Sequence, residues 1–324
     1  MAGVTWPGQD HKRLVGTEAD RLMSLSAASP AERRREGIAL AALVLGAVAM
    51  GVSPLFVRMA DVGPFASAFW RTALALPFLA LWALTETRSL PRRALSNRAV
   101  WLSGLLFAGD LFFWHLAILA TTVANATFLA TTAPLFVAAG AWFLLGERIQ
   151  QRGIAGLALC LIGGVALVGH SYGYEPQRLA GDFYGVVTAV FFAGYMLALR
   201  AARRDVPTGT LSFFSAAITT VILFVIAFAL EPRLLPQSTH GWTVLIALAL
   251  ISQVAGQGLL AFALGTLPAP FSSLVIFLEA VAAALFAWIV LHEALEPMQW
   301  LGGVLILAGI WVARPRHTAA GSLP

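Results

Sequence analysis

AWFLLGERIQQRGIAGLALCLIGG, residues 141–164, aligns without gaps with AWIVLHEALEPMQWLGGVLILAGI, residues 287–310, at a shift of 146 residues. Matches of Ala and Leu arise readily by chance in apolar sequence, whereas matched acids and glycines do not. The aligned pairs include one acid and two glycines: Glu147 with Glu293, Gly156 with Gly302, and Gly163 with Gly309. The alignment indicates that the chain consists of two related halves.

The composition is that of a membrane protein. Of 324 residues, 59% are hydrophobic and 11% are charged, and the mean hydropathy is +0.81. Soluble domains have roughly 25% charged residues, so this chain has less than half the usual supply of solvated side chains. Apolar runs of about 20 residues, the length that crosses a bilayer core, recur along the whole sequence. We therefore expect a polytopic membrane protein.

Charges, Gly and Pro divide the sequence into ten apolar segments. Their ranges are 38–57, 64–84, 99–119, 123–145, 150–169, 182–200, 209–230, 242–264, 269–291 and 297–313. Each half then holds five spans, and because five is odd the second half must enter the membrane from the opposite side. We expect an all-α integral membrane protein with ten transmembrane helices as a 5+5 inverted repeat, an architecture of secondary transporters.

The same division predicts the organisation of the whole chain. Residues 1–37 are a cytoplasmic tail that is poor in bulky apolar residues and that we expect to be disordered. The remaining parts are a first five-helix repeat at 38–169, an external linker at 170–181, a second repeat at 182–313 and a cytoplasmic tail at 314–324.

Lys and Arg predict the orientation in the membrane. With a cytoplasmic N-terminus, 17 of the 21 fall on the inside, three fall outside and Arg71 lies within a span. This is the distribution of the positive-inside rule. We expect a multi-pass protein of a bacterial-type inner (plasma) membrane with both termini cytoplasmic. The basic residues give orientation rather than a nucleic-acid surface. The single Cys160 permits no intrachain disulfide.

Three motifs in this order resemble a known family. They are FWRTALALP at 69–77, APLFVAAGAWFLLGER at 133–148 and LEAVAAALFAWIVLHE at 278–293. The chain from about 38 to 313 resembles the EamA-type branch of the drug/metabolite transporter (DMT) superfamily, and in particular its aromatic amino-acid exporters. The family often has Glu-Pro where this chain has Glu279-Ala280, and usually Gly-Glu where it has His292-Glu293.

Four ionisable residues fall within spans, namely Arg71, Asp110, His115 and Glu279. Such groups usually face a bundle interior or a water-filled cavity. Glu279 shares a helical face with Ser272, Ile276 and Ala283. It is either a cavity carboxylate that meets a substrate amine or a proton, or an acid that fixes the ninth span to a neighbour.

The remaining ionisable residues also have two interpretations each. Asp110 shares a face with Trp114, whereas His115 lies about 140° around the helix from Asp110, so the two are not a pair. His115 is a packing residue or a proton carrier. Arg71 reaches towards the external surface, caps a polar group, or binds a substrate carboxylate.

Neutral side chains complete a predicted substrate path. Its residues are Glu279, Asp110, Trp114, Asn125, Thr188, Phe191, Tyr195, Gln253 and Gln257. The lining would suit a zwitterion with an apolar side chain. The alternative is that these polar groups hydrogen-bond between helices. Gly51, Pro54 and Pro134 interrupt spans and are predicted hinges.

The predicted function is therefore a secondary transporter that exports amino acids, with apolar and aromatic ones favoured, or related small metabolites, by alternating access. The alternatives are an exporter of multiple drugs or cationic compounds and a lipid flippase. We expect no enzyme, no cofactor and no metal, because Walker, G-x-S-x-G and HExxH motifs do not occur. The expected partners are the small-molecule substrate, membrane lipid, and protons carried by Glu279, Asp110 or His115. The sequence leaves the oligomeric state open.

Overall fold

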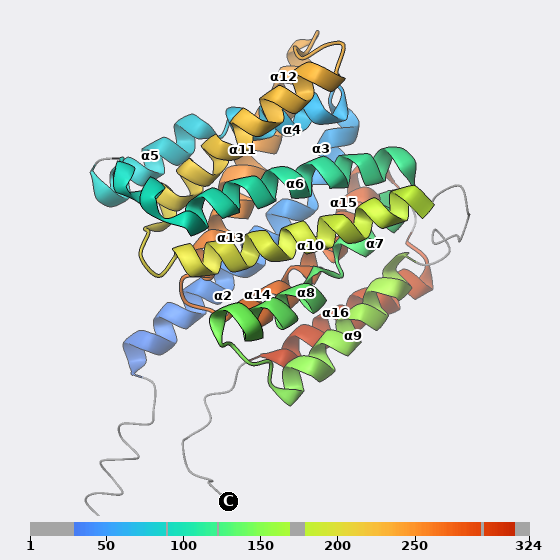
Figure 1. The fold of residues 1–324 in the computed structure, drawn as a ribbon. Coiled ribbons are helices and arrows are strands. Elements are labelled where there is room, and N and C mark those ends of the chain that lie inside the picture. Colours follow the sequence, from blue (N-terminus) through green and yellow to red (C-terminus); the bar gives the residue numbers. More distant parts are fainter. Residues whose placement is uncertain (1–28, 89, 122, 169–178, 293–294, 315–324) are drawn as a thin grey trace, which may run out of the picture. The chain divides into compact units, whose positions relative to one another are not determined.

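The computed structural model describes residues 29–88, 90–121, 123–168, 179–292 and 295–314. Within these ranges every regular element is a helix, and no strand occurs. Residues 39–314 form one compact unit, which is shown in Figure 1. Most of the tail at 1–37, most of the linker at 170–181, nearly all of the tail at 314–324, and Glu293 lie outside the described residues.

The helices follow the apolar segments of the sequence, except that α2 begins at Pro30, within the predicted tail, and α10 begins at Leu179, within the predicted linker. In the first half they are α2 (Pro30–Gly51), α3 (Ser53–Met59), α4 (Pro64–Ala73), α5 (Leu76–Thr87), the 3-10 helix η1 (Arg92–Ser96), α6 (Arg98–Ala120), α7 (Val123–Ala130), α8 (Ala133–Gly140), the π-helix η2 (Ala141–Leu145) and α9 (Gln151–Val168). In the second half they are α10 (Leu179–Ala202), α11 (Thr208–Leu230), α12 (Thr239–Ala247), the π-helix η5 (Leu248–Gln257), α13 (Gly258–Ala263), α14 (Ala269–Val275), α15 (Phe277–Leu291) and α16 (Pro297–Ala313).

Eight helical segments of the described chain are long and apolar enough to cross a membrane. They are Pro30–Met59, Pro64–Thr87, Arg98–Ala120, Phe128–Leu145, Leu179–Ala202, Thr208–Leu230, Thr239–Ala263 and Ala269–Val290. Two shorter apolar helices, Gln151–Leu167 and Pro297–Ala313, coincide with the fifth and tenth predicted spans.

Four of the spans are broken near their middle. In three of them, proline lies in the first turn of the helix that follows the break. These prolines are Pro54 in α3, Pro77 in α5 and Pro134 in α8. Proline fits there because the first helical N–H groups have no acceptor within the helix. The break between α14 and α15 has no proline at the junction. There the N–H of Glu279 bonds to the carbonyl of Ile276 at 2.8 Å, in a tight i to i−3 turn.

α9 and α16 lie side by side through the matched glycines (Figure 1). A Cβ atom on Gly156 would come within 2.5 Å of the Gly309 carbonyl oxygen, and one on Gly309 within 2.7 Å of the Gly156 carbonyl oxygen. Gly163 and Gly302 face each other in the same reciprocal way. The two backbones can approach this closely only because neither carries a side chain at these positions.

This contact predicts a difference between two neighbouring glycines. Gly302→Ala should lower the midpoint of thermal unfolding, because the new Cβ would lie 2.5 Å from the backbone of Gly163 and Leu167. Overpacking of this kind costs about 1–3 kcal/mol. Gly303→Ala is the matched control, since its Cβ would lie 3.8 Å from Val281. Equal unfolding midpoints for the two variants in detergent would contradict the close contact.

Carboxylates link the ends of α4, α5 and α11 reciprocally. Glu231, just after α11, accepts the backbone N–H of Phe65 at the start of α4 at 3.0 Å. Glu86, at the end of α5, accepts the N–H groups of Thr208 and Gly209 at the start of α11, at 3.1 and 2.6 Å. Each acid thus satisfies N–H groups that the first turn of a helix leaves without a partner.

Asp61 makes a similar link outside the spans, at the start of α12. Its carboxylate accepts the Ser238 hydroxyl at 2.7 Å and the N–H groups of Ser238 and Gln237. The hydrogen bond from the Ser238 hydroxyl lowers the pKa of Asp61 below its usual value. The link is therefore complete at neutral pH and is lost as the pH falls through that lowered pKa.

Candidate functional site

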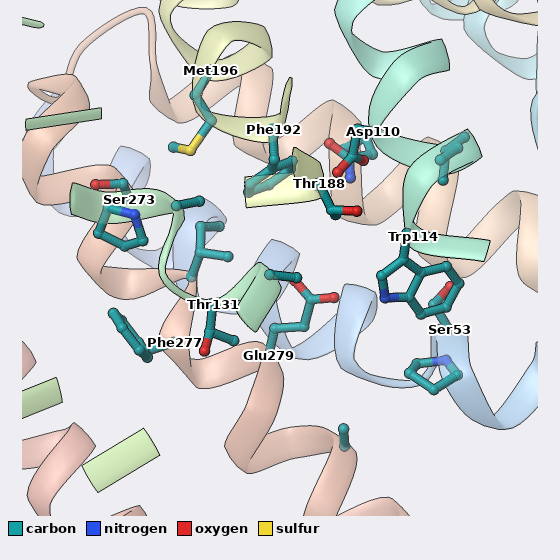
Figure 2. Close-up of a pocket in the computed structure, with 18 of the residues that line it drawn as sticks. Ser53, Asp110, Trp114, Thr131, Thr188, Phe192, Met196, Ser273, Phe277 and Glu279 are labelled. Carbon is teal, nitrogen blue, oxygen red and sulfur yellow. The ribbon is translucent and has the colours of Figure 1, made fainter. Parts of the chain in front are cut away.

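The broken spans surround a cavity of about 80 Å³, which is room for several waters. Figure 2 shows the cavity with most of its lining side chains. The lining comprises Ser53, Pro54, Arg71, Asp110, Leu111, Trp114, Ala130, Thr131, Ala133, Pro134, Thr188, Phe192, Met196, Gln257, Ser273, Ile276, Phe277, Glu279 and Ala283. Both halves of the chain contribute, and three of the four helix breaks supply lining residues.

Arg71 is buried beside this cavity with an exposure of 5%. Its Nε donates to Oε1 of Gln253 at 3.2 Å and its Nη1 donates to Oγ of Ser53 at 3.1 Å. The guanidinium carbon also lies 5.8 Å from the ring centre of Phe107. This geometry agrees with the interpretation that Arg71 caps polar groups and contradicts the interpretation that it reaches the surface, because two neutral acceptors hold it inside.

Two carboxylates share the cavity with Arg71. Asp110 has an exposure of 8%, and Glu279 is partly buried. In Figure 2 both side chains point into the cavity, and Thr188 lies between them in this view. Within the described part of the chain neither carboxylate makes a hydrogen bond or an ion pair. Arg71 attracts both carboxylates electrostatically, and their oxygens stay available to an occupant of the cavity that donates hydrogen bonds.

The break before α15 sets the position of Glu279. Ser273, Ile276, Glu279 and Ala283 line the cavity, whereas Ser272 does not, and its hydroxyl is buried without a partner among the described residues. The expected face placed Ser272 beside Glu279. The tight turn at Ile276 changes the register of the helix, so that Ser273 takes this place instead.

Gly51 holds the end of α2 against α15. A Cβ at Gly51 would come within 2.6 Å of the Glu279 carbonyl oxygen and 2.7 Å of the Ala282 Cβ. The chain breaks directly afterwards, and Pro54 and Pro134 both line the cavity. The three predicted hinge residues therefore lie at helix breaks or at a close helix contact next to the site, and their movement stays a prediction.

Of the three residues of α10 in the predicted path, Thr188 lines the cavity, whereas Phe191 and Tyr195 do not. Thr188, Phe192 and Met196 line the cavity at successive helical turns. Tyr195 instead stacks on Phe107 with ring centres 4.6 Å apart. Phe191 packs on Phe113 with ring centres 5.3 Å apart, and against Gly109.

Of the other residues of the predicted substrate path, some line the cavity and some do not. Trp114 and Gln257 line the cavity with Asp110, as the helical pattern of Asp110 and Trp114 predicts. Gln253 is buried and bonds to Arg71 rather than lining the cavity. The side chain of Asn125 lies outside the described part of the structure.

His115 is separate from the cavity. It has an exposure of 1%, and its Nδ1 lies 2.6 Å from the Leu111 carbonyl oxygen. Its ring packs on Trp114 and Phe65, and its Nε2 is buried without a partner in the described structure. His115 is not among the lining residues, whereas Asp110 on the same helix is.

Several lining residues are missed by reading the sequence. They are Ser53, Thr131, Phe192, Met196, Ser273 and Phe277. For Ser53 a signal was available, because a Ser-Pro pair inside a span marks both a break and a hydroxyl beside it. No cluster of three His, Cys, Asp or Glu residues that could hold a metal occurs in the described residues.

The two glutamines of η5 give a testable contrast. Gln253→Met should lower the free energy of unfolding by about 1.5–3 kcal/mol, because Arg71 loses a charge-assisted hydrogen bond. Gln257→Met should change it much less, since Gln257 donates only to the Met50 sulfur and its Oε1 has no partner in the described structure. Unfolding in detergent measures both, and equal losses would contradict the role of Gln253.

Comparison with known proteins identifies the family. The sequence profile of the EamA-like transporter family matches residues 37–169 and matches again at residues 179–314. The chain therefore belongs to the EamA-like transporter family, which contains the EamA-type members of the DMT superfamily. It is a multi-pass membrane protein in which the family domain is duplicated.

Individual relatives of this chain are named as transporters or exporters. An uncharacterized transporter of Archaeoglobus fulgidus is 27% identical over 81% of this chain and 91% of its own length. The pseudopaline exporter CntI of Pseudomonas aeruginosa is 26% identical over 74% of this chain and 82% of its own. The aromatic amino acid exporter YddG of Ancylobacter novellus is 30% identical over 47% of this chain and 53% of its own length.

A solved crystal structure supports the fold. Its chain superposes with a TM-score of 0.73 and 21% identity, over 87% of this chain and 96% of its own length. The arrangement of helices described above is thus shared with a known structure.

Proposed function

We propose that this protein is a secondary transporter that exports amino acids, apolar and aromatic ones in particular, or related small metabolites by alternating access. The observation that carries the proposal is the cavity that combines one arginine, Arg71, with two carboxylates, Asp110 and Glu279, which accept no hydrogen bond from any residue that the structure describes. Relatives named as exporters of amino acids and of pseudopaline support the direction of transport.

The proposed architecture is ten transmembrane helices in two inverted repeats, at 38–169 and 182–313. α9 and α16, with 18 and 17 residues, are about 26 Å long, slightly less than a bilayer core of about 30 Å, and they lie at the short end of the range of about 17–25 residues for transmembrane helices. Reciprocal contacts support the inversion. The glycines of α9 and α16 face each other. Glu86 of the first half contacts the start of α11 in the second half, and Glu231 of the second half contacts the start of α4 in the first half.

We further propose that both termini are cytoplasmic in a bacterial-type inner membrane. The support is the unequal distribution of Lys and Arg between the two sides, 17 against three. Export then means movement from the side on which α10 ends to the side on which it begins.

The proposed substrate is a zwitterion. Arg71 uses Nε and one N–H of Nη1 for Gln253 and Ser53, so other N–H groups of its planar fork could bind a carboxylate. Asp110 and Glu279 would accept an ammonium group. The aromatic lining residues Trp114 and Phe192 would contact an apolar side chain.

A second candidate is a cationic compound. Two carboxylates against one arginine give the cavity a formal negative charge when all three are ionised, which an organic cation or a bound proton would balance. The same balance makes Asp110 and Glu279 the proposed proton sites if export is coupled to protons.

Counterflow into proteoliposomes with a panel of radiolabelled amino acids at two pH values tests this function. Wild-type protein should take up apolar and aromatic amino acids. Arg71→Gln should abolish uptake of carboxylate-bearing substrates, and Glu279→Gln and Asp110→Asn should lower uptake and alter its pH dependence. His115→Gln is the control, because His115 does not line the cavity.

Two results would contradict the proposal. Uptake of organic cations without amino acids would favour the second candidate. Unchanged uptake and unchanged pH dependence in both Glu279→Gln and Asp110→Asn would show that the carboxylates only stabilise the fold.

A further inference from the structure

Beyond the substrate site, we propose that Glu147 and Arg200 form a gate that closes one end of the cavity. The proposal rests on alternating access, the mechanism of the proposed function, and adds the residues that control access. In this proposal Glu147 and Arg200 take part in the transport cycle without contacting the substrate.

The gate is a hydrogen-bonded network of four chain segments. Glu147 Oε1 accepts Arg200 Nε at 2.7 Å, and Glu147 Oε2 accepts the backbone N–H of Ala269 at 2.8 Å. Arg200 Nη1 also donates to the carbonyl oxygen of Leu264 at 2.8 Å. One ion pair therefore joins the segment after η2, the end of α10, the segment after α13 and the start of α14.

Its position follows from the helical register. Arg200 lies one turn beyond Met196 on α10, and Ala269 lies one turn before Ser273 on α14. Met196 and Ser273 both line the cavity, and in Figure 2 they lie at the end opposite to Trp114. On each of the two helices, the residue of the network thus lies one helical turn, a rise of about 5.4 Å along the axis, beyond a residue that lines that end of the cavity.

A turn at Gly146 places Glu147 in this network. Gly146 has φ +70°, a left-handed conformation that favours glycine, and the N–H of Glu147 bonds to the carbonyl of Ala141 at 3.0 Å. This turn ends the helix and directs the next residue across to α10. A gate residue needs such a fixed approach from outside the helix.

The strength of the pair also suits a gate. The side chains of Arg200 and Glu147 are 20% and 17% exposed, so protein does not fully enclose the pair. Partly exposed ion pairs contribute modestly to stability, and their partners can exchange for water. The network can therefore open during each cycle, unlike the close backbone contact of α9 with α16.

Glu86 provides a matched control. It also accepts two backbone N–H groups at the start of the next half's helix, those of Thr208 and Gly209. No residue of α5 or α11 lines the cavity. A substitution of Glu86 removes the same kind of contact without opening a path to the site.

Cysteine accessibility tests the gate without any substrate. In a Cys160→Ala background, Ser273→Cys is the reporter inside the cavity, and it is labelled with a small membrane-impermeant methanethiosulfonate in vesicles of both orientations. Gln150→Cys, at an exposed position, identifies the side on which the gate lies. Adding Glu147→Gln should raise the labelling rate of the reporter from that side by about fivefold or more, the lower end of typical coupling effects.

Arg200→Gln should produce the same rise, and Glu86→Gln should produce none. Unchanged labelling with both gate variants, in protein that elutes as folded wild type does, would overturn the gate. An equal rise with Glu86→Gln would overturn it too, because the effect would then be general loosening. A wrong substrate assignment leaves this result unaffected, so failure of the gate and failure of the proposed function are distinguishable.

Discussion

The guanidinium of Arg71 is the group that the interior of this protein must accommodate. A cation buried at membrane depth requires acceptors from the protein, because the hydrocarbon tails of lipids have none. The acceptors come from irregular backbone: Ser53 follows the break in the first span, and Gln253 lies in the π-helix η5. Irregular backbone at membrane depth is tolerated only where it is buried in protein or lines a cavity. The broken helices, the buried arginine and the cavity are therefore one feature.

The remainder of the fold supports this centre with two kinds of contact. Glycine-mediated backbone contact fixes α9 to α16, and a substitution there meets backbone atoms that cannot move aside. The carboxylate of Glu147 instead joins chain segments through a single side chain. Contacts of the first kind suit a scaffold, whereas those of the second kind can break and reform. The proposed alternating access requires both kinds of contact.

The sequence predicted the regular parts of the site and missed the irregular ones. Asp110 and Trp114 share a face of the unbroken helix α6, where the 3.6-residue period holds, and both line the cavity. The period fails at the tight turn at Ile276, so Ser273 replaces Ser272. α10 is regular, but its rotation about its own axis depends on packing such as Phe191 against Gly109, which periodicity does not encode. The direction of Arg71 likewise depended on acceptors distant in sequence.

The most direct test of the central claim is the affinity of purified protein for three matched ligands, phenylalanine, 3-phenylpropanoate and phenethylamine, by isothermal titration calorimetry. All three have the same aromatic ring. Phenylalanine carries both a carboxylate and an ammonium group, 3-phenylpropanoate carries only the carboxylate, and phenethylamine carries only the ammonium group. If Arg71 binds the carboxylate while Asp110 and Glu279 bind the ammonium, phenylalanine binds most tightly of the three. Equal or tighter binding of phenethylamine would contradict the zwitterion site and identify the cavity as one for cations.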